Sequence, residues 1–292
     1  HRVILLGIRS DIAKGLDLIT SRDFQLHAKP NEKTSLQEVI SDLPKLACFL
    51  SSRKTEGGKT RAEGTWKELL NFLKLTQKAQ WLKEYGNKNE KSLKVVSEIH
   101  STIQNLISKF HGIEGGQFIT FDSYRRIDKR HLAGWFFDRK LKGILNHETR
   151  PHMDTDLERY LFAACFAKVH GKSPNLHDFP DELNPDHKSA GTGNFSDRFR
   201  VQVAGEPATT ITSHISKDGH YFIHYDGSQC RSLSVREAAR IQTFPDNYFF
   251  CGPRTSQFHQ VGNAVPPFLA LQIARCVWNI LQQDTALLKQ KV

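Results

Sequence analysis

The sequence predicts an α/β protein, in which a larger domain of mixed α and β structure is inserted into part of a doubly wound sheet domain. Three observations predict this fold. Residues 3–8 form a continuous apolar run, which is typical of a strand buried on both faces of a parallel sheet. An apolar helical pattern follows Pro266 and Pro267 near the other end of the chain. The long segment between them mixes helical spacings of three and four residues with short alternating segments.

The predicted organisation has three segments. Residues 1–30 carry the strand of the sheet domain, residues 31–230 form the inserted domain, and residues 231–292 return to the sheet domain. The strand at residues 3–8 needs neighbouring strands, and no parallel sheet follows soon after it. We therefore expect the rest of this sheet to lie in sequence outside these 292 residues.

Helix start signals organise the first half of the inserted segment. Ser35 to Glu38 is a capping box that predicts a short helix ending before Pro44, and residues 51–64 predict a flexible loop. A second capping box at Thr65 predicts a helix, and another helix follows Gly86 and stops near Gly112. Their apolar faces are Trp66, Leu69, Leu70, Leu73 and Gln77 in the first, and Leu93, Val96, Ile99, Ile103, Leu106 and Phe110 in the second. The pair is most simply an antiparallel hairpin over a small core, with a nucleic-acid contact as the alternative.

The second half begins with a predicted helix from Asp154 to Gly171, followed by loop-rich sequence at residues 175–200. Residues 201–203, 209–215 and 220–224 alternate like short strands. A third capping box at Ser234 starts a helix that ends before Pro245. The final helix, after Pro267, carries Leu269, Ile273, Val277, Trp278 and Leu281.

The net charge of +10 indicates an anionic partner, although a diffuse excess of lysine can also serve solubility alone. The basic residues gather between residues 125 and 142, at Arg125, Arg126, Lys129, Arg130, Arg139, Lys140 and Lys142. Aromatic residues lie among them, at Tyr124, Trp135, Phe136 and Phe137. Positive charge with flat rings favours a nucleic-acid surface over a lipid surface. No apolar run is long enough to span a membrane, and no secretory signal is recognisable at residues 1–8.

Five scattered cysteines without a CxxC pair argue against a disulfide scaffold or a zinc knuckle, and they fit a reducing cytosol. His220 and His224 would share one face of a regular strand, where they could ligate a metal. We favour no metal site, because the two histidines share a face only if this strand is regular.

Three segments carry a resemblance to a known family. Residues 231–246, Arg-Ser-Leu-Ser-Val-Arg-Glu-Ala-Ala-Arg-Ile-Gln-Thr-Phe-Pro-Asp, resemble the ninth motif block of DNA cytosine-5 methyltransferases. Residues 260–266, Gln-Val-Gly-Asn-Ala-Val-Pro, resemble the tenth block, and residues 2–9 resemble the end of the eighth. The blocks occur in the family's order, so the chain resembles the C-terminal half of such an enzyme. The resemblance implies a methyltransferase sheet domain with an inserted target recognition domain.

The resemblance also implies roles for individual residues. Arg2 would stabilise charge at O2 of a flipped cytosine. Asn263, Ala264 and Val265 would border the S-adenosylmethionine pocket. The recognition segment Thr210, Ile211 and Thr212 would lie near the space that the flipped base vacates in double-stranded DNA. On sequence alone, an edge strand rich in β-branched residues is the favoured explanation of these residues. Arg125, Arg126 and Arg130 would contact DNA, and Arg231, Glu237 and Arg240 would organise the structure.

The family's chemistry needs groups that this sequence lacks. A cysteine in Pro-Cys-Gln attacks cytosine C6, a glutamate in Glu-Asn-Val contacts N3, and a Phe-x-Gly-x-Gly loop holds the cofactor, and none of these motifs occurs here. We therefore expect the chain to be inactive without a missing N-terminal catalytic half. That half belongs either to the same polypeptide, which the start at His1 favours, or to a separate subunit of a split enzyme. The rival hypothesis is a non-catalytic, sequence-specific DNA-binding module. The expected setting is restriction-modification in the prokaryotic cytosol, in association with the nucleoid.

Overall fold

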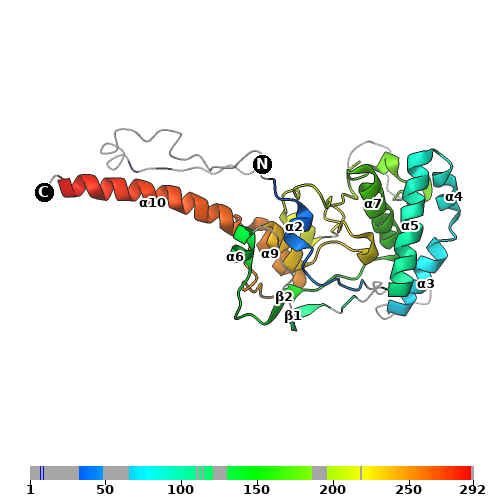
Figure 1. Cartoon of the computed structure of the whole chain (residues 1–292), viewed down its shortest axis with the longest axis horizontal. Coiled ribbons are helices and arrows are strands. Elements are labelled where there is room, and N and C mark those ends of the chain that lie inside the picture. Colours follow the sequence, from blue (N-terminus) through cyan, green and yellow to red (C-terminus); the bar gives the residue numbers. More distant parts are fainter. Residues whose placement is uncertain are drawn as a thin grey trace. The chain divides into compact units, whose positions relative to one another are not determined.

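The computed structural model describes residues 7, 9, 33–48, 66–109, 112–113, 115–120, 130–185, 196–217 and 219–290 (Figure 1). The chain divides into two compact units, one of residues 33–264 and one of residues 1–32 and 265–292. The predicted strand at residues 3–8 lies outside the described residues, apart from Gly7. In the second unit the structure describes one long helix, α10 (Pro267–Gln290), which begins with proline at the first helical position, where its missing N–H costs nothing.

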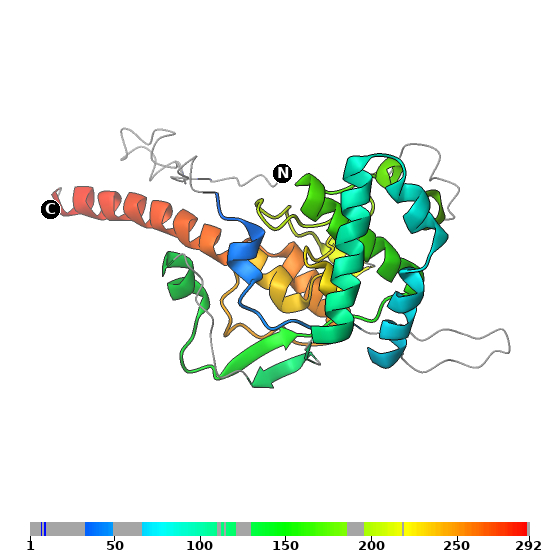
Figure 2. The same ribbon diagram turned by 45° about the vertical axis from the view of Figure 1, so that its right-hand side comes forward.

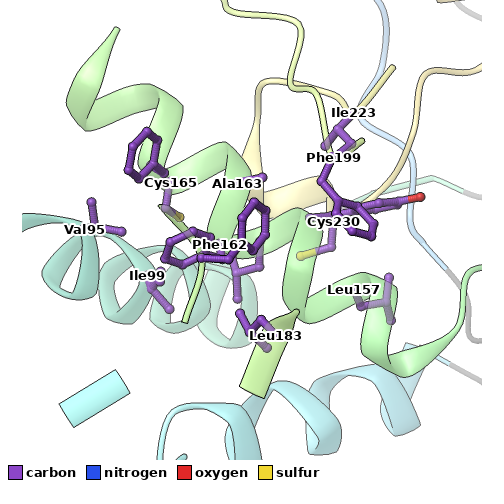
Figure 3. Close-up of a cluster of buried hydrophobic side chains, with 14 of the residues drawn as sticks. Val95, Ile99, Leu157, Phe162, Ala163, Cys165, Leu183, Phe199, Ile223 and Cys230 are labelled. Atoms are coloured by element: carbon purple, nitrogen blue, oxygen red, sulfur yellow. The ribbon is translucent and has the colours of Figure 1, made fainter. Parts of the chain in front are cut away.

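Four helices surround the larger hydrophobic core of the unit formed by residues 33–264. They are α3 (Trp66–Thr76), α4 (Gln80–Gly86), α5 (Glu90–Lys109) and α7 (Asp154–His170). Helix α5 packs against both α4 and α7, as two views of the molecule show (Figures 1 and 2). Figure 3 shows Ile99 of α5 and Phe162 of α7 within this core, and both side chains are fully buried. Helix α7 ends at Gly171, whose φ of 69° is the left-handed conformation that glycine adopts without strain.

A second core lies in the same unit under shorter elements. Buried side chains of α2 (Leu36–Ile40), α8 (Val235–Ile241), α9 (Arg254–Asn263) and β2 (Gly143–His147) belong to it. Helix α6 (Arg130–Phe136) contributes Leu132 and Phe136 to a separate small cluster, and strand β1 (Gly116–Thr120) pairs with β2. The strands pair antiparallel, with Gly116 opposite His147 and Phe118 opposite Leu145. Short 3-10 helices connect the longer elements: η1 (Leu176–Asp178), η2 (Asp181–Leu183), η4 (Ser213–Ser216) and η5 (Gly227–Gln229). This mixture of helix and strand is consistent with the predicted α/β class.

The capping signals predicted helices well. Ser35 caps α2 and Ser234 caps α8, each through a reciprocal capping box, and the helix predicted after Asp154 is confirmed. The expected face of α5 is wrong at Leu93, which is 55% exposed, because Val95 points into the core instead. Thr65 and Phe110 lie outside the described residues. Helices α4 and α9 were not predicted, since neither has a capping side chain at its N-terminus.

The strand predicted at residues 209–215 is wrong. Residues 213–216 form the 3-10 helix η4, and the described backbone nearby shows only isolated bridges, of Val201 with Ile223 and of Ile223 with Ser232. The β-branched composition of the segment suggested a strand. Its polar groups instead bond to side chains and to local turns, so no ladder forms.

Among the described helices, none combines the length and apolar character that crossing a membrane requires. On α10, Trp278 is 60% exposed and Leu281 is 46% exposed. The apolar stripe predicted for this helix is therefore exposed at Trp278 and Leu281 and half-buried at Leu269, Ile273 and Val277.

Helix α9 approaches η4 closely because residue 262 is glycine. A Cβ placed on Gly262 would lie 2.3 Å from the backbone nitrogen of Ser213 and 2.4 Å from the carbonyl carbon of Thr212. Backbone atoms cannot move aside as a flexible side chain can. The missing side chain at position 262 therefore accommodates the chain's own backbone at residues 212–213.

We predict that Gly262→Ala lowers the free energy of unfolding by about 1–3 kcal/mol, because overpacking against backbone forces α9 and η4 apart. Urea denaturation of the wild type and the variant measures this change. Gly205→Ala is the control, since a Cβ there would meet no atom within 4 Å. Equal denaturation midpoints for Gly262→Ala and Gly205→Ala would contradict the packing argument.

Candidate functional site

Three buried arginines lie on helix α8 or just before it. Arg231, Arg236 and Arg240 are each at most 1% exposed, although a buried charge is costly unless it is paired and hydrogen-bonded. Arg231 precedes the capping residue Ser234, and the other two arginines lie four residues apart on the helix. Each guanidinium binds a different part of the chain, so α8 is the point at which these parts meet.

Arg231 forms a bidentate ion pair with Glu237, with both nitrogen–oxygen distances 2.7 Å, and it also donates to Oε1 of Gln229 at 2.6 Å. Glu237 accepts a further hydrogen bond from the backbone N–H of Ser234 at 2.7 Å. Burial raises the pKa of Glu237, but the charge and hydrogen bond of Arg231, together with the neighbouring His224 and His147, outweigh burial and hold that pKa well below its usual value. Glu237 is therefore charged inside the protein and serves as both ion-pair partner and helix cap.

Arg240 pairs with two carboxylates that are distant from each other in sequence. Its Nε and Nη2 donate to Asp246 at 2.9 and 2.8 Å, and its Nη1 donates to Asp42 at 2.5 Å. Nη1 also donates to the carbonyl of Val39 at 3.0 Å, at the end of α2. Arg240 thus joins α2, α8 and the loop after α8.

Arg236 binds only backbone carbonyls. It donates to the oxygens of Leu145, Pro245 and Tyr248 at 2.8, 3.1 and 2.6 Å. With no carboxylate among these partners, burial lowers the pKa of Arg236 to about 10. Arg236 remains charged at neutral pH and attaches strand β2 and the loop at residues 245–248 to α8.

Two neutral histidines complete this network. His147 lies between the carbonyl of Pro44 and the hydroxyl of Ser234, both at 2.9 Å, so Nε2 carries the proton and Nδ1 accepts from Ser234. Nδ1 of His224 accepts from the backbone N–H of Asp226 at 3.0 Å. Burial lowers the pKa of both histidines to about 4.

The segment predicted to face DNA lies at the surface above α8 and α9. Thr210 and Thr212 are exposed, whereas Ile211 between them is fully buried in the second core. The alternation leaves two hydroxyl groups facing outward from a backbone that Ile211 anchors. Such an arrangement can offer hydrogen bonds to a polar partner.

The basic and aromatic stretch is divided between surface and core. Arg125 and Arg126 lie outside the described residues, and Arg130 is the first residue of α6, where only its backbone is described. Phe136 is buried, and Arg240 lies 5.6 Å from the centre of its ring.

Trp135 and Phe137 belong to the same inward packing. Trp135 donates to the carbonyl of Thr243 at 2.7 Å, and Arg240 lies 5.5 Å from the ring centre of Phe137. The predicted placement of these rings on a nucleic-acid surface is therefore wrong for Phe136, because they pack around Arg240. Arg139, Lys140 and Lys142 remain exposed.

The predicted cofactor residues lie where helix α9 ends. Asn263 is the last residue of α9 and is exposed, and Ala264 follows it in extended conformation. Val265 is 52% exposed and begins the other unit. Next to these residues, the backbone at residues 212–213 occupies the space that a side chain at Gly262 would take. Arg2 lies outside the described residues.

The two histidines considered as metal ligands bond to protein groups. Nδ1 of His220 lies 2.9 Å from the hydroxyl of Tyr160, and His224 belongs to the Glu237 network. In the part of the chain that the structure describes, no three His, Cys, Asp or Glu side chains are grouped as metal ligands.

A pocket of about 860 Å³ opens between α5, α7 and the loops at residues 203–206 and 225–228. Two of the three lysines at its wall form ion pairs, Lys45 with Asp226 and Lys168 with Glu98, both at 2.6 Å. These paired charges indicate no preference for either an anion or a cation.

Sequence reasoning missed Asn146, Gln202 and Gln242. Asn146 has a φ of 53° within β2 and pairs its amide with the N–H and carbonyl of Phe250, at 2.9 and 3.0 Å. Asparagine tolerates this conformation better than most residues, which was the one signal available. Gln202 and Gln242 belong to no residue pattern with a regular spacing, so the sequence did not indicate their contacts.

Comparisons with known proteins agree with the resemblance in the motif blocks. The family model described as "C-5 cytosine-specific DNA methylase" matches residues 1–278. Type II methyltransferase M.Bpa9945I of Bacillus paralicheniformis is 49% identical over 139 residues, which are 48% of this chain and 30% of that relative. Type II methyltransferase M1.HphI of Haemophilus parahaemolyticus is 37% identical over 134 residues, 46% of this chain and 31% of the relative. The chain thus spans about a third of the length of these two curated relatives.

We predict that Arg231→Met lowers the free energy of unfolding by about 3–5 kcal/mol, because Glu237 is left charged and buried without its cation. In the double variant Arg231→Met with Glu237→Gln, about 0.5–3 kcal/mol should be recovered relative to additivity. Urea denaturation of the four proteins in the cycle measures this coupling. The control is Lys94→Met, which removes an exposed pair with Glu90 and should change stability little. If the two stability changes simply added in the double variant, the Arg231–Glu237 ion pair would not stabilise the protein as proposed.

The buried histidines predict that stability falls with acidity. His147 and His224 have pKa values of about 4 when folded and near 6.5 when unfolded, so the unfolded chain binds more protons between these values. The free energy of unfolding should be constant above pH 6.5 and then fall by up to about 1.4 kcal/mol per pH unit for each histidine. In His147→Gln, the contribution of one histidine to this slope should disappear. Urea titrations at pH 7.5, 6.5, 5.5 and 4.5 measure it, and an unchanged slope would contradict the assignment.

Proposed function

The chain belongs to the C-5 cytosine-specific DNA methylase family, and from this premise we propose that it supplies the DNA-recognition and closing parts of a DNA cytosine-5 methyltransferase. The reaction would transfer a methyl group from S-adenosylmethionine to C5 of a cytosine within a specific sequence of double-stranded DNA. The observation that carries the proposal is the match over residues 1–278, which includes every motif block found in the sequence. The relatives' designation as type II methyltransferases supports a restriction-modification setting.

DNA recognition would centre on the exposed hydroxyl groups of Thr210 and Thr212. Hydroxyls can contact phosphates, sugars or base edges, and the buried Ile211 limits how far this segment can move. Arg125, Arg126 and Arg130 would add phosphate contacts, and each phosphate neutralised steepens the salt dependence of binding. These residues would position the duplex while the target cytosine leaves the stack.

Asn263, Ala264 and Val265 would border the cofactor. When bound, S-adenosylmethionine supplies the methyl group. The exposed amide of Asn263 makes no hydrogen bond to any residue in the described ranges, so its donors and acceptor suit a polar group of such a ligand. Ala264 and Val265 are small enough for a ligand to approach the backbone. Arg2 would hold its guanidinium against O2 of the flipped cytosine.

The cysteines support assigning the nucleophile to another region. A thiolate nucleophile needs a lowered pKa and access to substrate. Burial raises the pKa of Cys165 to about 12 and that of Cys230 well above its usual value, and Cys48 is also buried. Cys251 is exposed, but the next residue is Gly252 rather than the glutamine of Pro-Cys-Gln.

The network around α8 would keep the recognition segment in place. Arg231 and Glu237 fix the start of the helix, and Arg240 attaches it to α2 and to Asp246. We assign these three residues an organising role. All three side chains are buried, so they would not contact DNA or cofactor directly. They would act by holding other side chains in position.

We predict that the purified 292-residue chain transfers no methyl groups above background, and that adding its catalytic half restores transfer. Tritiated S-adenosylmethionine and unmethylated plasmid DNA measure the activity. The complete enzyme should also form a covalent adduct with DNA in which 5-fluorocytosine replaces cytosine.

The two arms test separate claims. Methyl transfer by the chain alone would contradict the division of roles. A complete enzyme that neither transfers methyl groups nor forms the adduct would contradict the proposed reaction and would favour the non-catalytic DNA-binding module.

A further inference from the structure

The segment that carries Thr210 is held from behind by a buried glutamine. Gln202 is 1% exposed, and its Oε1 accepts from both the backbone N–H and the hydroxyl of Thr209, each at 3.0 Å. Its Nε2 donates to the carbonyl of Tyr221 at 2.9 Å. Both ends of the amide are therefore used, and the residue next to Thr210 is fixed through its backbone and its side chain.

A second buried glutamine holds the other side of the same segment. Gln242 follows α8 and is 4% exposed, and its Nε2 lies 3.4 Å from the carbonyl oxygen of Ile211 and 3.1 Å from that of Val261. It thus links the recognition segment to the end of α8 and to α9. Thr210 lies between the two attachment points.

The chain just before this segment is also fixed. The backbone N–H groups of Leu36 and Gln37, at the start of α2, donate to the carbonyls of Glu206 and Ala204 at 2.8 and 3.0 Å. These N–H groups would have no partner within the helix, so the loop at residues 204–206 satisfies them. The recognition segment and the chain before it are thus anchored at residues 204, 206, 209 and 211, and none of these residues belongs to a sheet.

We propose that Gln202 and Gln242 are positioning residues that hold Thr210 in the orientation needed for contact with the DNA around the target cytosine. The inference rests on the proposed function. It adds Gln202, which lies outside the motif blocks, and gives a specific contact role to Gln242, which lies within the ninth block. A loop without ladder hydrogen bonds would otherwise sample many conformations. Since misplacing a contacting group by about 1 Å can cost about 100-fold in rate, fixing the backbone on both sides of Thr210 serves the contact directly.

The test uses the complete enzyme carrying Gln202→Met, which keeps the side-chain length and removes the amide. Gln257→Met is the matched control. Gln257 is also 1% exposed, and its amide donates to Gln117 and Gly252, both at 2.8 Å, so neither of these partners belongs to residues 202–213. Bisulfite sequencing of methylated plasmid first locates the target cytosine. A duplex with 2-aminopurine at that position then reports by fluorescence whether the base has left the stack, and the unmodified duplex reports affinity.

For Gln202→Met we expect binding of the unmodified duplex within about twofold of Gln257→Met, and a 2-aminopurine signal and a kcat that are lower by about tenfold or more. Gln242→Met should behave in the same direction. Equal signals and equal kcat in Gln202→Met and Gln257→Met would overturn the proposal, because the amide would then serve stability alone.

A second variant keeps the test decisive if Gln202→Met does not fold. Thr209→Val removes the hydroxyl contact with Gln202 at an exposed position and leaves the backbone contact. We expect a smaller loss of signal and kcat in the same direction, about threefold, and no loss would overturn the proposal. A wild-type enzyme that gives no 2-aminopurine signal and no methyl transfer would instead overturn the proposed function itself.

Discussion

A carboxylate inside a protein requires a cation and hydrogen-bond donors, and Glu237 obtains them from the residues that define helix α8. Arg231 supplies the charge, Ser234 supplies a backbone donor, and the neutral His147 orients the hydroxyl of Ser234. The same carboxylate of Glu237 thus both caps the helix and forms the ion pair. The elements that bind the other α8 arginines, α2, β2 and the loop at residues 245–248, hold their positions only while this helix holds its own.

Local signals in the sequence were sufficient for much of the helical structure. A capping box requires only residues three apart, so α2 and α8 could be predicted from Ser35 and Ser234. Helix α4 has neither a capping side chain nor a long periodic pattern. The burial of Val95 in place of Leu93 depends on where α4 and α7 pack against α5, and periodicity alone does not contain that information.

The residues of the candidate site likewise fall into those that the sequence suggested and those that only the structure revealed. Motif resemblance suggested roles for Thr210, Arg231 and Asn263, and these roles remain predictions. It did not identify Gln202 or Asn146, whose roles depend on contacts with residues 209 and 250. The strand expected at residues 209–215 failed for the same reason, since Gln202 satisfies Thr209 where a neighbouring strand would have done so. Buried amides replace a ladder here, and such contacts leave no periodic trace in a single sequence.

The groups that stabilise the second core thus also hold the segment that we propose for DNA recognition. Gln242 follows the helix that Glu237 caps, and it bonds to the recognition segment and to α9. Gly262 lets α9 lie directly against residues 212–213. This explains why a segment outside any sheet can still present a defined surface: its order comes from the buried charges and amides below it.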